Sequence, residues 1–132
     1  MKKSLITLLM VSFISSTLIG CGEPDTPKVQ DKDISIIYTT DVHCAIDEDS
    51  EQGYLGYAKV EAYKKSLQET NYVALVDSGD YLQGEFVGAI SKGEYVMEII
   101  NEMNYDVITL GNHEFDYGID VLKTRLSEFK GE

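Results

Sequence analysis

The sequence predicts an α/β domain built on a parallel sheet, for two reasons. First, three short segments are β-branched and largely apolar, as in strands that are covered on both faces, and segments with helical spacing of apolar residues separate them. Second, a polar cluster follows each apolar segment at once. The alternating order β-α-β-α-β-α calls for parallel strands joined by right-handed crossovers, with helices on both faces of the sheet.

The expected elements occupy the chain from residue 34 onward. The strands are expected at Ile34–Thr39, Tyr72–Val76 and Val107–Leu110. A helix is expected over residues 54–70, where apolar side chains recur at helical spacing, and a second helical region ends with residues 93–104. The last helix begins near Ile119, carries Asp120 in its first turn and runs to Phe129.

Residues 1–20 have the pattern of a secretory signal peptide rather than of a membrane span. Lys2 and Lys3 precede an apolar stretch that is interrupted by hydroxyl residues and is shorter than the roughly 20 apolar residues of a transmembrane helix. The segment Leu18-Ile19-Gly20-Cys21 resembles the processing box of bacterial lipoproteins. This resemblance implies a lipid on Cys21 and an extracytoplasmic protein that is lipid-anchored to the bacterial membrane. Ordinary secretion with a free Cys21 is the alternative.

Residues 21–33 predict a flexible tether, because they hold both prolines of the chain and almost no apolar side chains. The folded domain is then expected at residues 34–132. With Cys21 lipidated, Cys44 is the one other cysteine, which excludes a disulfide framework. We interpret Cys44 as a small residue packed beneath its loop, with a soft metal ligand as the alternative.

The chain carries 11 basic and 23 acidic residues, which gives a formal net charge of −12. Such a surface repels nucleic acid and anionic headgroups, so we expect no nucleic-acid partner and no membrane contact beyond the lipid on Cys21. The acidic surface also opposes an anionic substrate, unless bound cations reverse the field where that substrate docks. The oligomeric state stays open.

The chemistry is expected in the loops after the strands, because loops at the carboxyl ends of parallel strands converge on one crevice. Asp41 and His43 stand two residues apart after the first strand, so both can hold one cation, unless they only cap a loop. Asp80 follows the second strand after Gly79, which permits a sharp turn. Its carboxylate could bridge metals about 3.5 to 4 Å apart, or serve only the turn.

The loop after the third strand carries an amide, an imidazole and a carboxylate. Asn112 offers a carbonyl oxygen to a second metal, and His113 is its neighbour. Asp116 is three residues further on, where one turn would bring it to His113 and fix the tautomer of the ring. His113 could then contact phosphoryl oxygens or protonate the leaving oxygen, with an ordinary histidine–aspartate pair as the alternative. Ligands of these kinds suit divalent manganese, zinc, magnesium or iron.

Three motifs resemble the opening motifs of the calcineurin-like metallophosphoesterases. They are Asp41-Val42-His43, Gly79-Asp80-Tyr81-Leu82-Gln83-Gly84 and Thr109-Leu110-Gly111-Asn112-His113-Glu114-Phe115-Asp116-Tyr117-Gly118. The Gln-Gly extension and the Phe-Asp-Tyr-Gly ending are similar to the bacterial 5′-nucleotidase branch, which includes 2′,3′-cyclic phosphodiesterases. The resemblance covers nearly all of residues 34–130, and three motifs in the right order make it specific.

The resemblance implies a metal-dependent phosphoester hydrolase of nucleotides or related phosphate esters, whose fold is half of a metallophosphoesterase sandwich. The metal ligands that it implies are Asp41 and His43 for the first cation, Asp80 as a bridge and Asn112 for the second. Water activated between the two metals would attack phosphorus. His113, oriented by Asp116, would stabilise the transition state or assist the leaving alcohol.

Members of this family continue past the length of this chain and bring further histidine motifs, whereas here His43 and His113 are the two histidines. Four protein ligands are few for two metals, and three strands leave an exposed edge. We therefore expect an amino-terminal fragment of a hydrolase, with little or no turnover by itself. The alternative is a noncatalytic lipoprotein that keeps the fold remnant as a binding or vestigial module.

Overall fold

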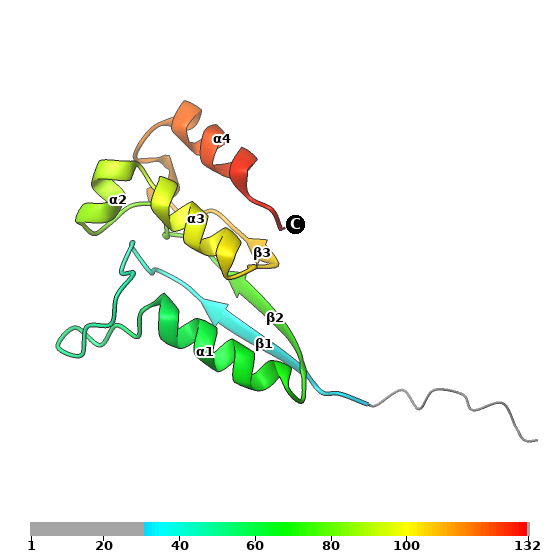
Figure 1. Ribbon diagram of the computed structural model, residues 1–132. Helices are drawn as coiled ribbons and strands as arrows, with labels where there is room; N and C mark the ends of the chain where they lie inside the picture. The colour runs from blue at the N-terminus through cyan, green and yellow to red at the C-terminus, as the bar shows by residue number, and fades with distance from the viewer. Residues whose placement is uncertain (1–30, 132) are drawn as a thin grey trace, which may run out of the picture. The chain divides into compact units, whose positions relative to one another are not determined.

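The computed structural model describes residues 31–131, in which three strands form one parallel sheet in the order β1-β2-β3 (Figure 1). The strands are β1 (Ile34–Thr39), β2 (Tyr72–Asp77) and β3 (Val107–Ile108). The helices are α1 (Tyr57–Gln68), α2 (Phe86–Ser91), α3 (Glu94–Glu102) and α4 (Ile119–Glu128), and η1 (His113–Phe115) is a short 3₁₀ turn. The predicted α/β class with a parallel sheet is confirmed.

The amino-terminal predictions fall mostly outside the described residues. The signal peptide, the lipidation site Cys21 and residues 21–30 of the tether all lie there, and residues 31–33 precede β1 without regular structure. Between residues 31 and 131, no helix has the length and apolar content that crossing a bilayer requires.

Helix boundaries differ from the expected ones where tight turns intervene. The first helix starts three residues later than expected, because the backbone of Tyr54 pairs with that of Asp49 and Gly56 then turns with a φ of 71°. The middle helical region is divided into α2 and α3, because Lys92 and Gly93 adopt left-handed φ values of 50° and 78°. The helices predicted from the apolar periodicity are therefore present, but the break between α2 and α3 depends on local backbone conformation.

The third strand is shorter than expected, with two residues in place of four. Beyond it, the backbone nitrogen of Thr109 still donates to the carbonyl of Asp77 at 3.0 Å. The backbone nitrogen of Gly111 does not continue this pairing and donates to the carboxylate of Glu114 at 2.7 Å. The loop that carries the polar cluster thus begins earlier than the apolar pattern indicates.

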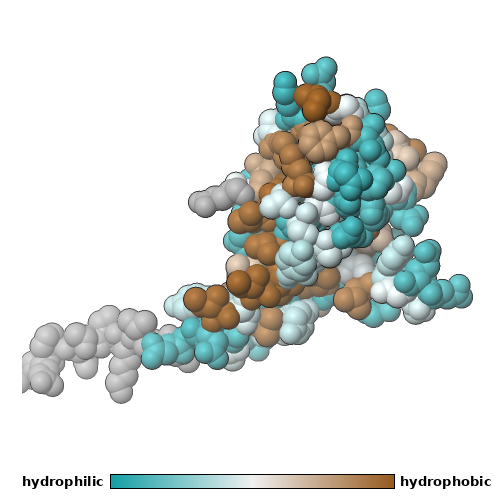
Figure 2. All heavy atoms as spheres, turned by 180° about the vertical axis from the view of Figure 1, so that it is seen from behind, coloured by the Kyte–Doolittle hydropathy of each residue, from teal (hydrophilic) through white to brown (hydrophobic). Residues whose placement is uncertain are grey.

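The two crossover helices α1 and α3 lie on the same face of the sheet. Strands that are neighbours in sequence order and are joined by right-handed crossovers require this arrangement. On this face Leu75 is fully buried, whereas Ile34, Ile36 and Tyr38 on the other face are 78%, 69% and 61% exposed. Figure 2, which views the molecule from behind, shows a band of hydrophobic residues. Residues 31–131 therefore supply helices to one face, and the expected second layer is not formed within them.

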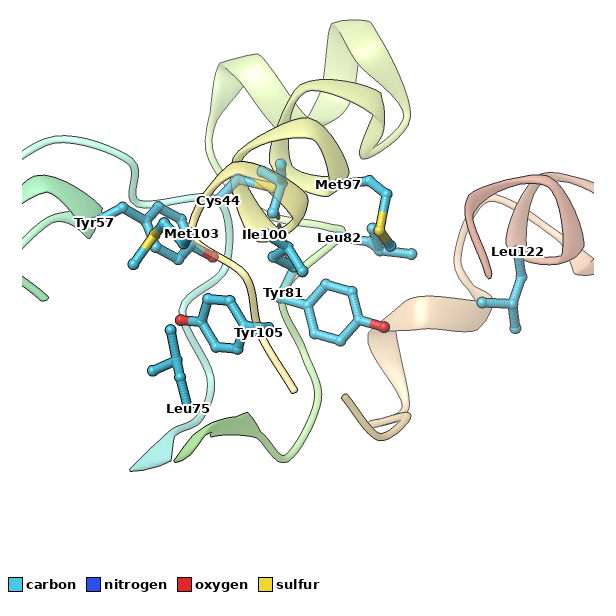
Figure 3. Close-up of a cluster of buried hydrophobic side chains, with 11 residues drawn as sticks. Cys44, Tyr57, Leu75, Tyr81, Leu82, Met97, Ile100, Met103, Tyr105 and Leu122 are labelled. Carbon is cyan, nitrogen blue, oxygen red and sulfur yellow. Dashed lines mark hydrogen bonds between the residues drawn. The ribbon is translucent and has the colours of Figure 1, made fainter. Parts of the chain in front are cut away.

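One cluster of buried side chains lies between the sheet and the helices (Figure 3). It comprises Cys44, Tyr57, Leu75, Tyr81, Leu82, Val96, Met97, Ile100, Met103, Tyr105 and Leu122. Because α3 contributes three of these residues and α1 contributes Tyr57, both crossovers share one core. Cys44, Tyr81 and Leu82 come from the loops after β1 and β2, so the core reaches up to the loops in which the chemistry is expected.

Candidate metal centre

The loops after β1 and β2 are held together by backbone hydrogen bonds. The nitrogen of Asp41 donates to the carbonyl of Gly79 at 3.1 Å, and the nitrogen of His43 donates to the carbonyl of Asp80 at 2.9 Å. Asp41, His43 and Asp80 have φ values of 52°, 47° and 60°. Such left-handed values are uncommon outside glycine and concentrate at functional sites, where the surrounding structure enforces them.

The loops after β2 and β3 approach each other closely at two glycines. A Cβ atom on Gly79 would overlap the backbone nitrogen of Gly111. A Cβ atom on Gly111 would overlap the carboxylate of Asp80. Gly79 also has a φ of 110°, so this position requires glycine both for its conformation and for the contact.

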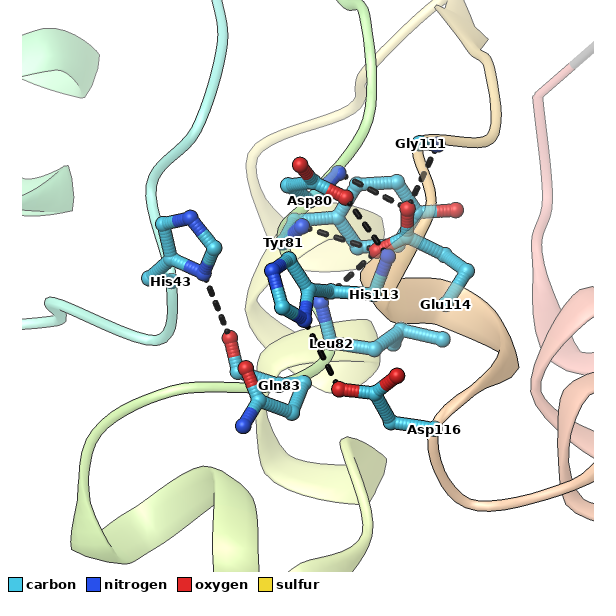
Figure 4. A network of polar contacts seen from close by, with 9 residues as sticks. All are labelled: His43, Asp80, Tyr81, Leu82, Gln83, Gly111, His113, Glu114 and Asp116. Atoms are coloured by element: carbon cyan, nitrogen blue, oxygen red, sulfur yellow. Dashed lines mark hydrogen bonds and ion pairs between the residues drawn. The ribbon is translucent and has the colours of Figure 1, made fainter.

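Three side chains from the three loops converge at this edge of the sheet. One ligand atom each of His43, Asp80 and His113 lies within 4.8 Å of the other two (Figure 4). The two imidazole rings meet edge to face, with centroids 5.1 Å apart and planes at 74°. Imidazole nitrogens and a carboxylate oxygen are ligands for zinc, manganese and iron, so the donor set fits a divalent cation.

A backbone carbonyl orients the ring of His43. Its Nδ1 atom lies 3.1 Å from the carbonyl oxygen of Gln83. Since a carbonyl only accepts hydrogen bonds, Nδ1 is the protonated nitrogen of the neutral ring and Nε2 is free to bind a metal. The Gln-Gly extension noted in the sequence therefore supplies a contact that fixes the tautomer of a candidate ligand.

The ring of His113 is oriented in the same way, but by a side chain. Its Nδ1 atom lies 2.7 Å from Oδ2 of Asp116. This hydrogen bond is the main cause that raises the pKa of His113 above its ordinary value of 6.5. The contact between His113 and Asp116 that their spacing in the sequence predicts is therefore present. The catalytic role of the two residues stays a prediction.

Asp41, one of the expected metal ligands, is not part of the converging group. Its side chain is exposed, and its carboxylate accepts the hydroxyl of Thr40. Asn112 is exposed, and its backbone carbonyl accepts a hydrogen bond from Phe115 at 3.4 Å. Metal binding by Asp41 and Asn112 stays a prediction. His113, which was expected to act on the phosphate, lies among the ligand atoms.

Each residue of the converging group is followed directly by a fully buried one. The three following residues are Cys44, Tyr81 and Glu114, which are 1%, 0% and 1% exposed. The thiol of Cys44 donates to the carbonyl of Tyr81 at 3.2 Å, and burial raises the pKa of the thiol to about 12. The interpretation of Cys44 as a packed residue is confirmed, and the candidate ligands are anchored directly to the core.

Two buried acidic residues near the site had no role in the sequence analysis. The carboxylate of Asp77 accepts the hydroxyl of Thr39 at 2.6 Å and the nitrogen of Gly79 at 2.7 Å. Burial is the main cause that raises the pKa of Asp77 to about 6. The second residue is Glu114, whose carboxylate accepts only backbone hydrogen bonds. Asp77 could have been identified from the sequence, because it directly continues an apolar strand. Nothing in the sequence indicates that Glu114 is buried.

Comparison with known proteins matches the same part of the chain. The family model described as calcineurin-like phosphoesterase matches residues 34–131. The trifunctional nucleotide phosphoesterase protein YfkN of Bacillus subtilis is 34% identical over 106 residues, which are 80% of this chain and 7% of that protein. The 2′,3′-cyclic-nucleotide 2′-phosphodiesterase/3′-nucleotidase of Haemophilus influenzae is 31% identical over 114 residues, which are 76% of this chain and 17% of that protein.

A solved structure has the same fold over most of the chain. It is a Staphylococcus aureus protein, described as a 5′-nucleotidase, in complex with α-ketoglutarate. The match has a TM-score of 0.60 and 26% sequence identity, and covers 74% of this chain and 21% of that chain. The present chain therefore spans between 7% and 21% of the length of these three proteins.

Proposed function

This chain belongs to the calcineurin-like phosphoesterase family, whose members are phosphoester hydrolases that use divalent metals, and we propose a nucleotide-directed activity within it. In this proposal the whole protein hydrolyses nucleotides or related phosphate esters. The single observation that carries this proposal is the convergence of His43, Asp80 and His113 within 4.8 Å at the carboxyl ends of parallel strands. The nucleotide phosphoesterases among the relatives support the substrate class.

We propose that the centre holds two divalent cations. The residues that would hold them are Asp41 and His43 for one, Asn112 for the other and Asp80 for both. The shared position of His43 and Asp80 and the backbone bond from Asp41 to Gly79 support the assignment of these three ligands. The assignment of Asn112 is supported by the family motif in which it stands. When bound, such cations neutralise charge on phosphoryl oxygens and lower the pKa of a water nucleophile. They would also offset the net charge of −12, which by itself repels an anionic ester.

The side chains of His113 and Asp116 handle the proton of the leaving group in this proposal. Asp116 accepts the hydrogen bond from Nδ1, which leaves Nε2 of His113 for the substrate. The protonated ring donates a hydrogen bond to a phosphoryl oxygen or gives its proton to the leaving oxygen. The carboxylate of Asp116 holds the ring in this orientation and stabilises its positive charge.

Phosphate release from AMP tests the activity. With added Mn²⁺, the whole protein should release phosphate, and the chelator EDTA should stop the release. The variant Asp80→Asn should lose this activity, because an amide oxygen is a weaker metal ligand than a carboxylate. Asp47→Asn is the matched control, since this exposed residue lies outside the converging group and should keep the activity. Failure to turn over any nucleotide with Mn²⁺ would favour the noncatalytic binding or vestigial module.

We also propose that a lipid on Cys21 holds the protein outside the cytoplasm. The sequence Leu18-Ile19-Gly20-Cys21 supports this proposal. Mass spectrometry of the membrane fraction should find a diacylglyceryl group on an amino-terminal Cys21, and Cys21→Ser should lack it. Recovery of the unmodified wild-type protein from the secreted fraction would contradict the proposal.

A further inference from the structure

Beyond the residues that would touch metal or phosphate, we infer that Glu114 is a positioning residue of the candidate metal centre. It sets the distance between the loop that carries Asp80 and the loop that carries His113. The inference rests on the proposed function only for the identity of the ligands. The contacts that carry it are those of the Glu114 carboxylate itself.

The carboxylate of Glu114 binds the backbones of both loops at once (Figure 4). Its Oε1 atom accepts the nitrogens of Tyr81 at 2.9 Å and Leu82 at 3.1 Å. Its Oε2 atom accepts the nitrogens of Asp80 and Gly111, each at 2.7 Å. A carboxylate offers about four lone-pair sites, so a single side chain uses all of them on main-chain donors.

These contacts are largely buried and are reciprocal. Glu114 is 1% exposed, and its bonds from Asp80, Tyr81 and Leu82 are buried, whereas the bond from Gly111 is part-buried. Water therefore cannot readily replace a lost partner of the first three nitrogens. The side chain of Glu114 binds the backbone of Asp80, while the side chain of Asp80 binds the backbone of His113 at 2.8 Å. The two loops are therefore joined crosswise, and each candidate ligand is fixed through the other loop.

The acceptor geometry requires a glutamate at this position. In Glu114→Gln, an amide group with two hydrogens would face two backbone nitrogens that also carry hydrogens. In Glu114→Asp, the side chain is one methylene shorter and cannot reach both loops as glutamate does. The first change removes two of the hydrogen bonds, because donors then face donors. The second change keeps the accepting carboxylate but shortens the side chain, so the two variants separate the effect of acceptor chemistry from that of side-chain length.

The test uses the full chain and two independent measurements. Amide hydrogen exchange of the metal-free protein reports on the nitrogens of Asp80, Tyr81, Leu82 and Gly111 without reference to any metal. Calorimetric titration with Mn²⁺, well below the unfolding temperature, reports on the site. Glu98→Gln is the matched control, because it makes the same chemical change on an exposed residue of α3.

In Glu114→Gln, we expect faster exchange at the four amides, unchanged far-ultraviolet circular dichroism and at least about tenfold weaker Mn²⁺ binding. Glu114→Asp should lie between this variant and wild type, and Glu98→Gln should match wild type. Wild-type Mn²⁺ affinity in a folded Glu114→Gln protein, or unchanged exchange at the four amides, would overturn the inference. Loss of the fold in both Glu114 variants would also overturn it, because the residue would then serve stability alone. If wild type binds no Mn²⁺, the proposed function fails while the exchange data still decide the role of Glu114.

Discussion

Oδ1 of Asp80 accepts a hydrogen bond from the backbone nitrogen of His113, at 2.8 Å. Two of the three converging residues, 33 positions apart in sequence, are thereby joined without any metal. One oxygen of the Asp80 carboxylate holds the neighbouring loop, and the other oxygen would face the two proposed cations. The spacing of the ligands thus depends on how closely the two loops approach.

Alanine in place of Gly79 should push these loops apart, because its Cβ atom would overlap the backbone of Gly111. Gly53 is the matched control: its φ of 81° imposes a similar left-handed strain, but no atom lies within 4 Å of the added Cβ. Gly53→Ala should cost about 1 to 2 kcal/mol of unfolding free energy and keep Mn²⁺ binding. Gly79→Ala should cost more and weaken the binding. Equal Mn²⁺ affinities in calorimetry would show that the close approach does not matter.

The pKa of the His113 imidazole should lie above the ordinary histidine value of 6.5. Its hydrogen bond to Asp116 favours the charged ring, so the pKa is raised above 6.5 and the protonated form persists to higher pH. Proton NMR of the metal-free chain can follow both histidines, with His43→Gln to assign the signals. Asp116→Asn should lower the pKa of His113, because it removes the negative charge. A His113 titration that ignores this change would contradict the role given to Asp116.

The buried carboxyl of Asp77 predicts a fall in stability between about pH 4 and pH 6. In the unfolded chain the group ionises near 3.8, whereas burial raises its pKa to about 6 in the folded chain. Within that window the folded state binds more protons, so the unfolding free energy decreases as pH rises. At about 1.4 kcal/mol per pKa unit, the loss reaches up to about 3 kcal/mol and is constant above the window.

Urea denaturation at pH 4 and pH 7 measures this contribution of Asp77. The difference between the two pH values should be smaller in Asp77→Asn than in wild type, because asparagine does not ionise. Other carboxyl groups contribute to both proteins alike, so the comparison isolates one residue. An identical pH dependence in the two proteins would remove Asp77 as its source.

The two faces of the sheet should respond differently to truncation of apolar side chains. Leu75 is 0% exposed on the helix-covered face, so Leu75→Ala should cost about 2 to 5 kcal/mol. Ile36 is 69% exposed on the other face, so Ile36→Ala should cost less than about 1 kcal/mol. Thermal or urea unfolding compares the two variants. Similar losses would mean that something covers the face of Ile36 in solution.

The sequence predicted the order and type of the main elements, because apolar periodicity depends on local burial. It did not predict the division between α2 and α3, which depends on left-handed backbone at Lys92 and Gly93. Nor did it predict that Ile34 and Ile36 would be exposed. The apolar pattern of this strand is the same whether helices cover one face of the sheet or both. Coverage is decided by the order of strands and the hand of the crossovers.

The motifs in the sequence contain the three residues that converge, although Asp41 and Asn112 were expected as ligands in place of His113. The motifs do not show how the converging residues are held. His43, Asp80 and His113 follow strand ends, a position that sequence patterns reveal. The hydrogen bonds of Glu114 reach residues more than 30 positions away in sequence. Such contacts exist only after two loops have met, so no local pattern marks the residue as buried.

The direct succession of a candidate ligand and a buried residue, as at His43 and Cys44, has a consequence for the thermodynamics of cation binding. The main chain at each ligand cannot rearrange without disturbing the packed interior, so these donors are preorganised. Conformational entropy that a flexible loop would lose on capturing an ion has already been lost when the polypeptide folds. Association with a metal should therefore alter the ordering of these loops very little.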